Sequence, residues 1–121
     1  MTDCYFFDSY AIIEIIRGSP NYRRFANSVI VTTKLNLFEV FYILNRDIGP
    51  KIAESILEKY YKFAIDYGIG IIQASAMMRL NNKPHFSMAD CVGYKLAEYL
   101  GIKFLTGDDH FQGFPNIEFV K

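Results

Sequence analysis

The chain has 121 residues, with 13 Lys and Arg against 13 Asp and Glu, two Cys and 51% hydrophobic residues. This length supports one domain, residues 1–121, which can bury roughly two-thirds of its unfolded surface without a disulfide framework. The composition excludes a disordered chain, the balanced charge is unlike that of a general electrostatic DNA binder, and no apolar run approaches the ~18 residues needed to span a bilayer.

The cysteines and the first residues indicate a cytoplasmic protein. Cys4 and Cys91 form no CxxC pair, which excludes a zinc ribbon or a redox motif and predicts free thiols in a reducing compartment. Asp3 stands where a secretory signal would carry basic residues, so no signal peptide is expected.

Strand and helix signals alternate along the first half of the chain. Short apolar or β-branched runs predict strands, whereas apolar residues three or four apart predict helices that end at Gly or Pro. The expected elements are a strand at 4–7, a helix at 10–16, a strand at 29–32, a helix at 33–47 and a helix at 51–67.

The same alternation continues in the second half. The apolar run at 69–72 favours a strand, and Ser87 and Gly101 bound the last helix as its N-cap and its C-terminal glycine. The expected elements are a strand at 69–72, a helix at 74–80, a loop at 81–84, a helix at 87–100, a strand at 103–106 and a strand at 117–120. Short apolar strands separated by helices predict an α/β fold, a three-layer α/β/α sandwich around a central, mainly parallel sheet.

Four carboxylates stand in core-forming sequence rather than in polar sequence. Asp8 and Asp108 each follow an expected strand, while Glu39 and Asp90 lie in apolar stretches of two expected helices. In parallel sheets, ligands gather outside the carboxyl ends of the strands, and all four acids could face that edge. One acid in such a place is more often a helix cap or a solvated edge residue, but four in apolar context favour a functional site.

Convergence of these acids would carry an electrostatic cost. At separations of about 6 Å, each like-charge pair costs roughly 3 kcal/mol at an effective dielectric near 20. Several such pairs rival the ~5–15 kcal/mol stability of a whole domain. A convergent site therefore requires protonation or a cation, and all-oxygen ligands suit a hard ion, Mg²⁺ or Mn²⁺.

Four segments of the chain resemble the acidic motifs of the PIN domain family in order, spacing and total length. They are Phe6-Phe7-Asp8-Ser9, Asn36-Leu37-Phe38-Glu39-Val40, Ser87-Met88-Ala89-Asp90 and Phe104-Leu105-Thr106-Gly107-Asp108-Asp109-His110-Phe111. Each motif is weak by itself, and the four in sequence are strong. Within the family, the length and the Ile-Ile-Glu-Ile-Ile-Arg-Gly stretch at 12–18 look most like VapC-type toxins of toxin–antitoxin systems.

The resemblance implies a PIN-like fold and a Mg²⁺- or Mn²⁺-dependent ribonuclease that hydrolyses RNA phosphodiester bonds. The catalytic acids would be Asp8, Glu39, Asp90 and Asp108, and the metal ligands would be Asp8, Asp90 and Asp108. The family also implies a homodimer. In its toxin branch, a small antitoxin protein covers the acidic site.

Three further residues are expected to support the acids. Ser9 and Thr106 match the family's hydroxyl positions, where they would hold a water or a phosphate oxygen, although a local cap or turn bond is as good an explanation. The family pattern Thr-x-Asp-x-x-Phe selects Asp108 as the fourth acid and leaves Asp109 as a neighbouring outer acid.

Basic residues outside the acid set could contact an RNA backbone. Without the four acids, the balance is 13 basic to 9 acidic residues. Phosphate contacts position a nucleic acid, and a solvated rim is the alternative role for these side chains. The candidates are Arg17, Arg23 and Arg24 after the first helix, and Arg79 and Lys83 before Asp90.

Two other functions stay open alongside a toxin ribonuclease: a PIN-like module that binds RNA or protein without cutting, and an RNA-processing nuclease that is not a toxin. The complete acid set argues against the first. Other phosphate-handling folds fit poorly. A haloacid-dehalogenase phosphatase would need a second acid where Tyr10 stands, and Gly68-Ile69-Gly70 lacks the third glycine of a nucleotide fingerprint.

Overall fold

The computed structural model describes residues 3–82 and 85–121. In chain order, its elements are β1 (Cys4–Phe7), α1 (Ser9–Arg17), η1 (Pro20–Phe25), β2 (Val29–Val31), α2 (Lys34–Asp47), α3 (Pro50–Tyr60), η2 (Tyr61–Phe63), α4 (Ile69–Asn81), α5 (Met88–Leu100), β3 (Lys103–Thr106), η3 (Asp109–Phe111) and β4 (Ile117–Phe119).

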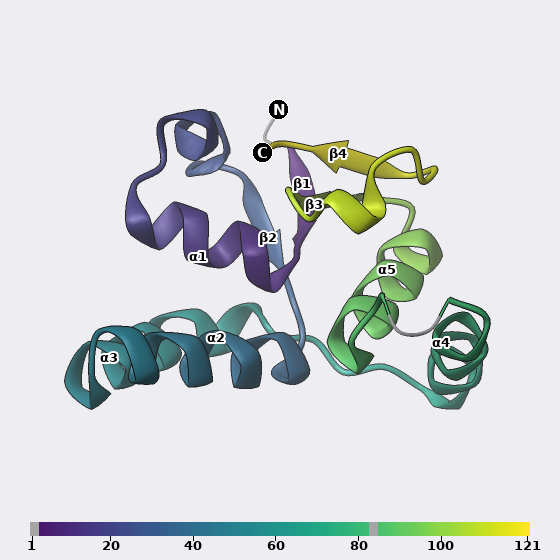
Figure 1. Cartoon of the computed structure of the whole chain (residues 1–121), viewed down its shortest axis with the longest axis horizontal. Helices are drawn as coiled ribbons and strands as arrows, with labels where there is room; N and C mark the ends of the chain where they lie inside the picture. Colours follow the sequence, from purple (N-terminus) through teal and green to yellow (C-terminus); the bar gives the residue numbers. More distant parts are fainter. Residues whose placement is uncertain (1–2, 83–84) are drawn as a thin grey trace.

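The four strands form one parallel sheet in the order β2-β1-β3-β4. Phe6 of β1 lies opposite Val31 of β2 and Phe104 of β3 in the register. Because the strands are parallel, their carboxyl ends meet at one edge, and α1, α2 and η3 all begin just beyond it (Figure 1). The predicted parallel α/β architecture is confirmed.

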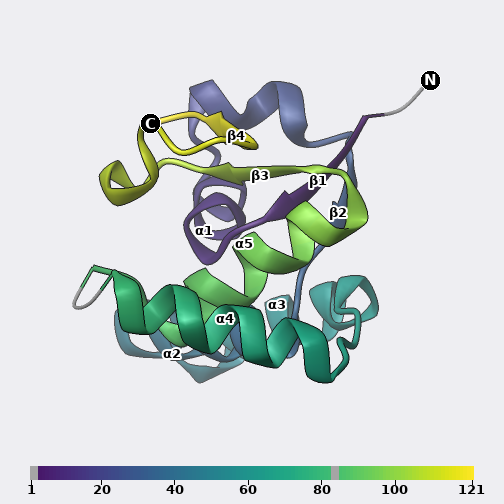
Figure 2. The same cartoon turned by 90° about the vertical axis from the view of Figure 1, so that its right-hand side faces the viewer.

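Helices cover both faces of the sheet, because alternate strand residues point to opposite sides. Phe7 and Leu105 pack into one core with α1, η1, α2 and α3. Phe6 and Phe104 pack into a second core with α4, α5 and η3. Figures 1 and 2 show α1 and α5 on opposite sides of the strands, with α4 lying outside α5. The fold is the expected three-layer sandwich.

The close approach of α5 to the sheet depends on Gly93. A Cβ atom at this position would lie 2.6 Å from a ring carbon of Phe6 and 3.0 Å from one of Phe104. These two rings stack across the central strand pair at a centroid separation of 5.5 Å. The missing side chain therefore lets the helix that carries Asp90 settle directly onto the aromatic surface of the sheet.

One expected strand is wrong, and one expected helix is too long. Residues 69–72 form the first turn of α4, which continues through the helix expected at 74–80. The helix expected at 51–67 ends as α3 at Tyr60, with η2 following, and the chain then makes a single parallel bridge between Thr32 and Ala64. A run of four apolar residues cannot by itself distinguish a buried strand from a helical turn.

The other expected elements are present within one or two residues of their predicted ends. Both cysteines are free thiols, as expected, with Cys4 half-buried and Cys91 buried. Lys83 and part of the expected 81–84 loop lie outside the described residues. Within the described part of the chain, no helix combines the length and apolarity needed to cross a bilayer.

Replacing Gly93 with Ala should destabilise the fold by about 1–3 kcal/mol, because the new methyl group overlaps the Phe6 and Phe104 rings. The matched control is Gly70→Ala in α4, where the added Cβ meets nothing within 4 Å. That change should stabilise the protein by roughly 0.5–1 kcal/mol through helix propensity. Urea unfolding of both variants measures the difference, and equal effects would contradict the packing argument.

Candidate active site

Asp8 is a buried carboxylate at the carboxyl end of β1. It caps the N-terminus of α1 and is 2% exposed. Its Oδ1 accepts a hydrogen bond from the Ser9 backbone N–H at 2.9 Å, and its Oδ2 accepts one from the Thr106 hydroxyl at 2.7 Å. Both carboxylate oxygens are therefore fixed by groups from two different elements.

Thr106 joins Asp8 to Asp108. While its hydroxyl donates to Asp8, the same oxygen accepts the Asp108 backbone N–H at 3.1 Å. Gly107 lies between the two residues, where a Cβ would come 2.3 Å from the Val120 carbonyl oxygen and 2.4 Å from the Tyr10 ring. Only a glycine fits in this space, so the chain can pass close to Val120 and Tyr10 before it reaches Asp108.

Glu39 is held by a polar chain that runs inward from α2. The Ser9 hydroxyl donates to Glu39 Oε1 at 2.7 Å and accepts the Asn36 side-chain amide at 3.1 Å. Asn36 is fully buried, and its Oδ1 accepts from the Thr33 hydroxyl at 2.6 Å. Sequence reasoning assigned no role to Asn36, although a polar residue between Leu35 and Leu37 was the same signal that singled out Glu39.

Asp90 occupies the first turn of α5 and also takes part in a capping box. Its Oδ2 accepts the Ser87 backbone N–H at 2.9 Å, and the Ser87 hydroxyl accepts the Asp90 N–H at 3.1 Å. The cap uses one carboxylate oxygen, so the side chain is fixed in place while it lines the same cleft as Asp8 and Asp108.

Asp108 and Asp109 point to different partners. Asp108 Oδ1 accepts the His110 backbone N–H at 3.0 Å and lies 3.0 Å from His110 Nδ1. Asp109 is paired with Lys121 at 2.6 Å, and its side chain is 67% exposed. Asp108 lines the cleft with Asp8 and Asp90, whereas Asp109 forms an ion pair at the surface.

The four acids interact electrically. Burial raises the pKa of Asp8 well above its usual value, and the charges of Asp90 and Glu39 raise it further against the hydrogen bonds from Thr106 and Ser9. Burial also raises the pKa of Asp90 from 3.8 to about 6, opposed by its bonds to Ser87 and assisted by the charges of Glu39 and Asp108. These carboxyls resist ionisation unless a cation compensates them.

The donor set fits a hard divalent cation in charge and chemistry. Among residues 3–82 and 85–121, no lysine or arginine forms an ion pair with Asp8, Glu39 or Asp90. Buried anions without a partner are costly, and carboxylate oxygens are the ligands that Mg²⁺ and Mn²⁺ prefer. As the described side chains are placed, no three His, Cys, Asp or Glu residues close around a single ion position.

Asp8, Asp90 and Asp108 line a cleft of about 290 Å³ between α1 and α2, and Glu39 is not among its lining residues. Arg17, predicted as an RNA contact, lines this cleft. Arg46 and Asp47 at the end of α2 line it as well, and sequence reasoning missed both of them. Nothing in the local sequence sets Arg46 apart from other exposed helix arginines, so only the placement of α2 beside α1 identifies it.

The structure places the other predicted RNA contacts elsewhere. Arg23 is exposed on η1, and Arg24 lies 4.0 Å from Glu118 of β4. Arg79 donates through Nε to the Phe86 carbonyl oxygen at 3.3 Å. Lys83 lies outside the described residues.

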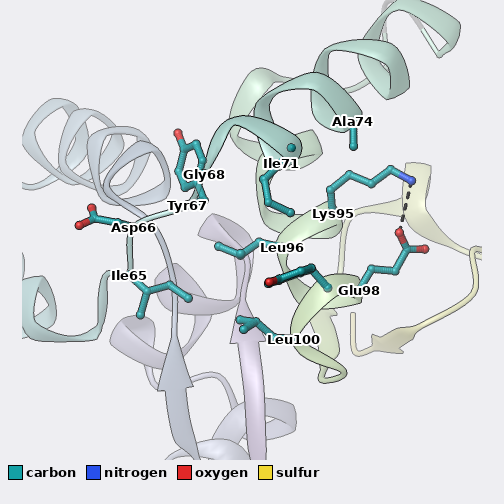
Figure 3. A pocket seen from close by; sticks show the side chains of 12 residues that line it. Ile65, Asp66, Tyr67, Gly68, Ile71, Ala74, Lys95, Leu96, Glu98 and Leu100 are labelled. Carbon is teal, nitrogen blue, oxygen red and sulfur yellow. Dashed lines mark hydrogen bonds and ion pairs between the residues drawn. The ribbon is translucent and has the colours of Figure 1, made fainter.

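A larger hollow of about 680 Å³ lies away from the acids, between the start of α4 and the end of α5. Figure 3 shows Ile71 and Leu96 at its centre, with the Lys95–Glu98 pair at one side, where Nζ and Oε1 are 3.3 Å apart. Its lining is mainly apolar and includes none of the four site acids. Size alone would therefore select a hollow that contains none of the four candidate acids.

Comparison with known proteins identifies relatives of the fold. The PIN domain profile matches residues 5–116, which includes all four acids. No curated protein matches the sequence significantly.

Two solved structures share the architecture at low sequence identity. The Mycobacterium tuberculosis toxin VapC20, described as cleaving the sarcin-ricin loop, is 16% identical, with a TM-score of 0.75 over 97% of this chain and 99% of that one. A toxin–antitoxin complex from Klebsiella pneumoniae contains a chain that is also 16% identical, with a TM-score of 0.71 over 93% of this chain and 94% of that one.

Without added metal, the protein should lose stability as the pH rises from about 4 to above 6. The folded state binds the Asp90 proton more tightly than the unfolded state, so this contribution is complete below the unfolded pKa near 3.8 and is lost through the folded pKa near 6. Asp90→Asn should remove that part of the slope, since its amide oxygen can still accept from Ser87. A shift of about two pKa units corresponds to on the order of 3 kcal/mol.

Thermal unfolding in EDTA across this pH range, on wild type and Asp90→Asn, measures the effect. The variant should be the more stable of the two at pH 7, with the difference vanishing near pH 4. Parallel stability curves for the two proteins would mean that Asp90 titrates as an ordinary surface carboxyl.

Proposed function

The chain belongs to the PIN domain family, and on that premise we propose that it is a metal-dependent endoribonuclease that hydrolyses RNA phosphodiester bonds as the toxin of a toxin–antitoxin pair. PIN domains are typically nucleases. The observation that carries the proposal is the group of four carboxylates at one sheet edge, which interact electrostatically. Three of them, Asp8, Glu39 and Asp90, have no lysine or arginine partner among the described residues. That arrangement suits cation-assisted chemistry on a phosphate.

Asp8, Asp90 and Asp108 would hold Mg²⁺ or Mn²⁺ at the mouth of the cleft. When bound, the ion supplies Lewis-acid stabilisation of the negative charge that develops on the phosphodiester, and it favours the ionised form of water. The protein supplies orientation. Thr106 fixes Asp8 through its hydroxyl and Asp108 through that residue's backbone N–H, so both carboxylates are aimed before any substrate arrives.

Glu39 is assigned as the proton acceptor. The Ser9 hydroxyl binds its Oε1 at 2.7 Å, and Ser9 is itself held by the buried Asn36 amide. We assign Oε2 as the atom that takes a proton from the attacking water. In this role Ser9 and Asn36 are positioning residues, because they act through Glu39 and not on the substrate.

The toxin assignment rests on the two structural neighbours. One is a toxin described as cleaving the sarcin-ricin loop, and the other belongs to a toxin–antitoxin complex. We propose that this chain likewise has a small antitoxin protein as its partner, which covers the acidic cleft. An RNA-processing nuclease with no antitoxin is the alternative that keeps the same chemistry.

We also propose a homodimer in the cytoplasm. Four large apolar side chains on α4 are exposed, namely Ile69, Ile72, Met77 and Leu80. An exposed apolar helix face suits burial against a second copy. The two free thiols fit a reducing compartment.

Purified protein should cut a labelled single-stranded RNA with Mg²⁺ or Mn²⁺, and excess EDTA should stop the cleavage. Asp8→Asn should lose activity by more than the roughly 10–100-fold expected for an outer-shell partner of a metal, because Asp8 is placed as a direct ligand. The matched control is Asp66→Asn, whose side chain is 95% exposed near Lys34. Gel electrophoresis of the products measures the cleavage rate of the wild type, Asp8→Asn and Asp66→Asn.

Cleavage by Asp8→Asn at the wild-type rate would refute the assigned site. Wild type that binds RNA and Mn²⁺ without cutting would instead favour the non-cleaving binding module.

Mn²⁺ or Mg²⁺ should raise the melting temperature of the wild type at pH 7.5, because an ion that binds only the folded state stabilises it by mass action. The rise should be smaller at pH 5, where Asp90 is mostly protonated. Asp8→Asn should show little rise at either pH. Differential scanning calorimetry at fixed ionic strength separates this effect from screening, and an equal rise in both proteins would place the ion elsewhere.

A further inference from the structure

Helices α1 and α2 run side by side in the same direction away from the acids. At one end, Ser9 of α1 donates to Glu39 of α2 at 2.7 Å. At the other end, Arg17 of α1 lies 3.7 Å from Asp47 of α2. Each helix advances eight residues between these contacts, about 12 Å at 1.5 Å per residue. The two helices therefore form parallel walls, as Figure 1 shows from the side.

The cleft between these walls has two chemically different ends. Asp8, Asp90 and Asp108 line the end where the helices begin. Ile13 and Ile43 lie between the ends, one from each helix. Positions four or eight apart share one face of a helix, so Ser9, Ile13 and Arg17 face α2 together. An extended ligand lying along the cleft would therefore pass from the carboxylates at one end to the guanidinium groups at the other.

The far end holds two arginines that converge on Asp47, and Arg17 also lies 4.0 Å from Glu14. Arg46 contacts Asp47 in a forked manner, with Nε at 2.8 Å from Oδ1 and a terminal nitrogen at 3.3 Å from Oδ2. The Arg17 guanidinium reaches the same Oδ2 at 3.7 Å. Both arginine side chains are half-exposed, so an anion from solvent can reach them. Two guanidiniums converging on an oxyanion is the geometry with which proteins bind phosphate.

We propose that Arg17 and Arg46 form a binding site for a backbone phosphate of single-stranded RNA other than the scissile one, with Asp47 as the internal anion that this phosphate replaces. The proposal rests on the ribonuclease function proposed above, and it deepens that function by giving the RNA a direction, along α1 and α2 away from the acids. Such a contact positions the strand without reading its sequence.

The arrangement explains why the acidic cleft can admit a polyanion at all. The acids repel phosphate unless a cation is bound, so the substrate needs an attractive contact that does not depend on the metal. Asp47 keeps the two guanidiniums directed into the cleft in the absence of RNA. A phosphate that displaces it gains two charge-assisted contacts and releases condensed counterions.

The test measures RNA binding apart from cleavage. Fluorescence anisotropy of a labelled oligouridine of about ten nucleotides is recorded in EDTA across a salt series, with the 121-residue chain. Arg17→Ala and Arg46→Ala should each weaken binding about tenfold and flatten the salt dependence by about 0.7 in log–log slope, the value for one single-strand phosphate contact. Asp47→Asn should bind severalfold more tightly, because the competing anion is gone.

The double variant Arg17→Ala/Arg46→Ala should bind little more weakly than either single variant, since both side chains hold one phosphate. The matched control is Lys95→Ala, which removes a lysine paired with Glu98 at 3.3 Å beside the larger hollow, away from the acids. It should bind RNA like the wild type. Thermal unfolding of each variant excludes a folding defect as the cause.

Wild-type affinity and salt slope in both single variants would overturn the proposal, as would equal losses in the Lys95 control. Weaker binding by Asp47→Asn would overturn the replacement role of Asp47. Metal-dependent cleavage with no arginine effect would leave the nuclease standing without this site. Arginine-dependent binding in a protein that never cuts RNA would support the phosphate site and refute the nuclease.

Discussion

The hydrogen bond from Thr106 to Asp8 connects residues 98 positions apart in the sequence, and the candidate site is arranged around it. It exists because β1 and β3 are neighbours in the sheet. Along the chain, β2 and all five α-helices lie between these two strands. The bond fixes the Asp8 carboxylate at the end of one strand and, through the same hydroxyl, the start of the turn that carries Asp108. Glu39 and Asp90 then approach from α2 and α5, whose positions follow from packing on the two faces.

Electrostatics and packing oppose each other at this sheet edge. Apolar packing draws the four acids together, while their burial and mutual repulsion raise the pKa values of Asp8 and Asp90. Hydrogen bonds from Thr106, Ser9 and Ser87 offset part of that cost without neutralising the charge. The fold therefore holds carboxylates whose ionised form is unfavourable. Such groups are common where a protein binds a charged ligand. At the far end of the same two helices, Arg17 and Arg46 are already paired with Asp47, whereas Asp8, Glu39 and Asp90 have no lysine or arginine partner among the described residues.

Much of the fold and the four candidate acids could be predicted from the sequence, because the patterns that indicate them lie in short stretches of the chain. Each acid follows an apolar strand or interrupts an apolar helix, and parallel strand ends meet at one edge by geometry alone. The predicted strand at 69–72 is wrong because Ile is favoured in strands, so the local sequence does not indicate a helix. The segment is helical in the structure, where Ile71 packs against α5. Arg46 could not be identified from the sequence as a residue of the cleft, because its place there depends on how α2 lies beside α1. Motif spacing predicts Asp108 over Asp109 as the fourth acid. The structure places Asp108 in the cleft and Asp109 in a surface pair with Lys121, which the sequence could not show.

The order of the strands in the sheet also affects the order in which contacts form during folding. Pairing β1 with β3 closes a loop of nearly the whole chain, and such non-local contacts form late because the entropy of closing the loop must be met before they add stability. Helices and the α2–α3 hairpin can form early from local contacts, but none of them alone brings Asp8 to Thr106. Ser9 and Glu39 can meet within the first half of the chain, but the contact between Asp8 and Thr106 requires both ends of the chain, so the complete acid cluster forms only when β1 and β3 pair.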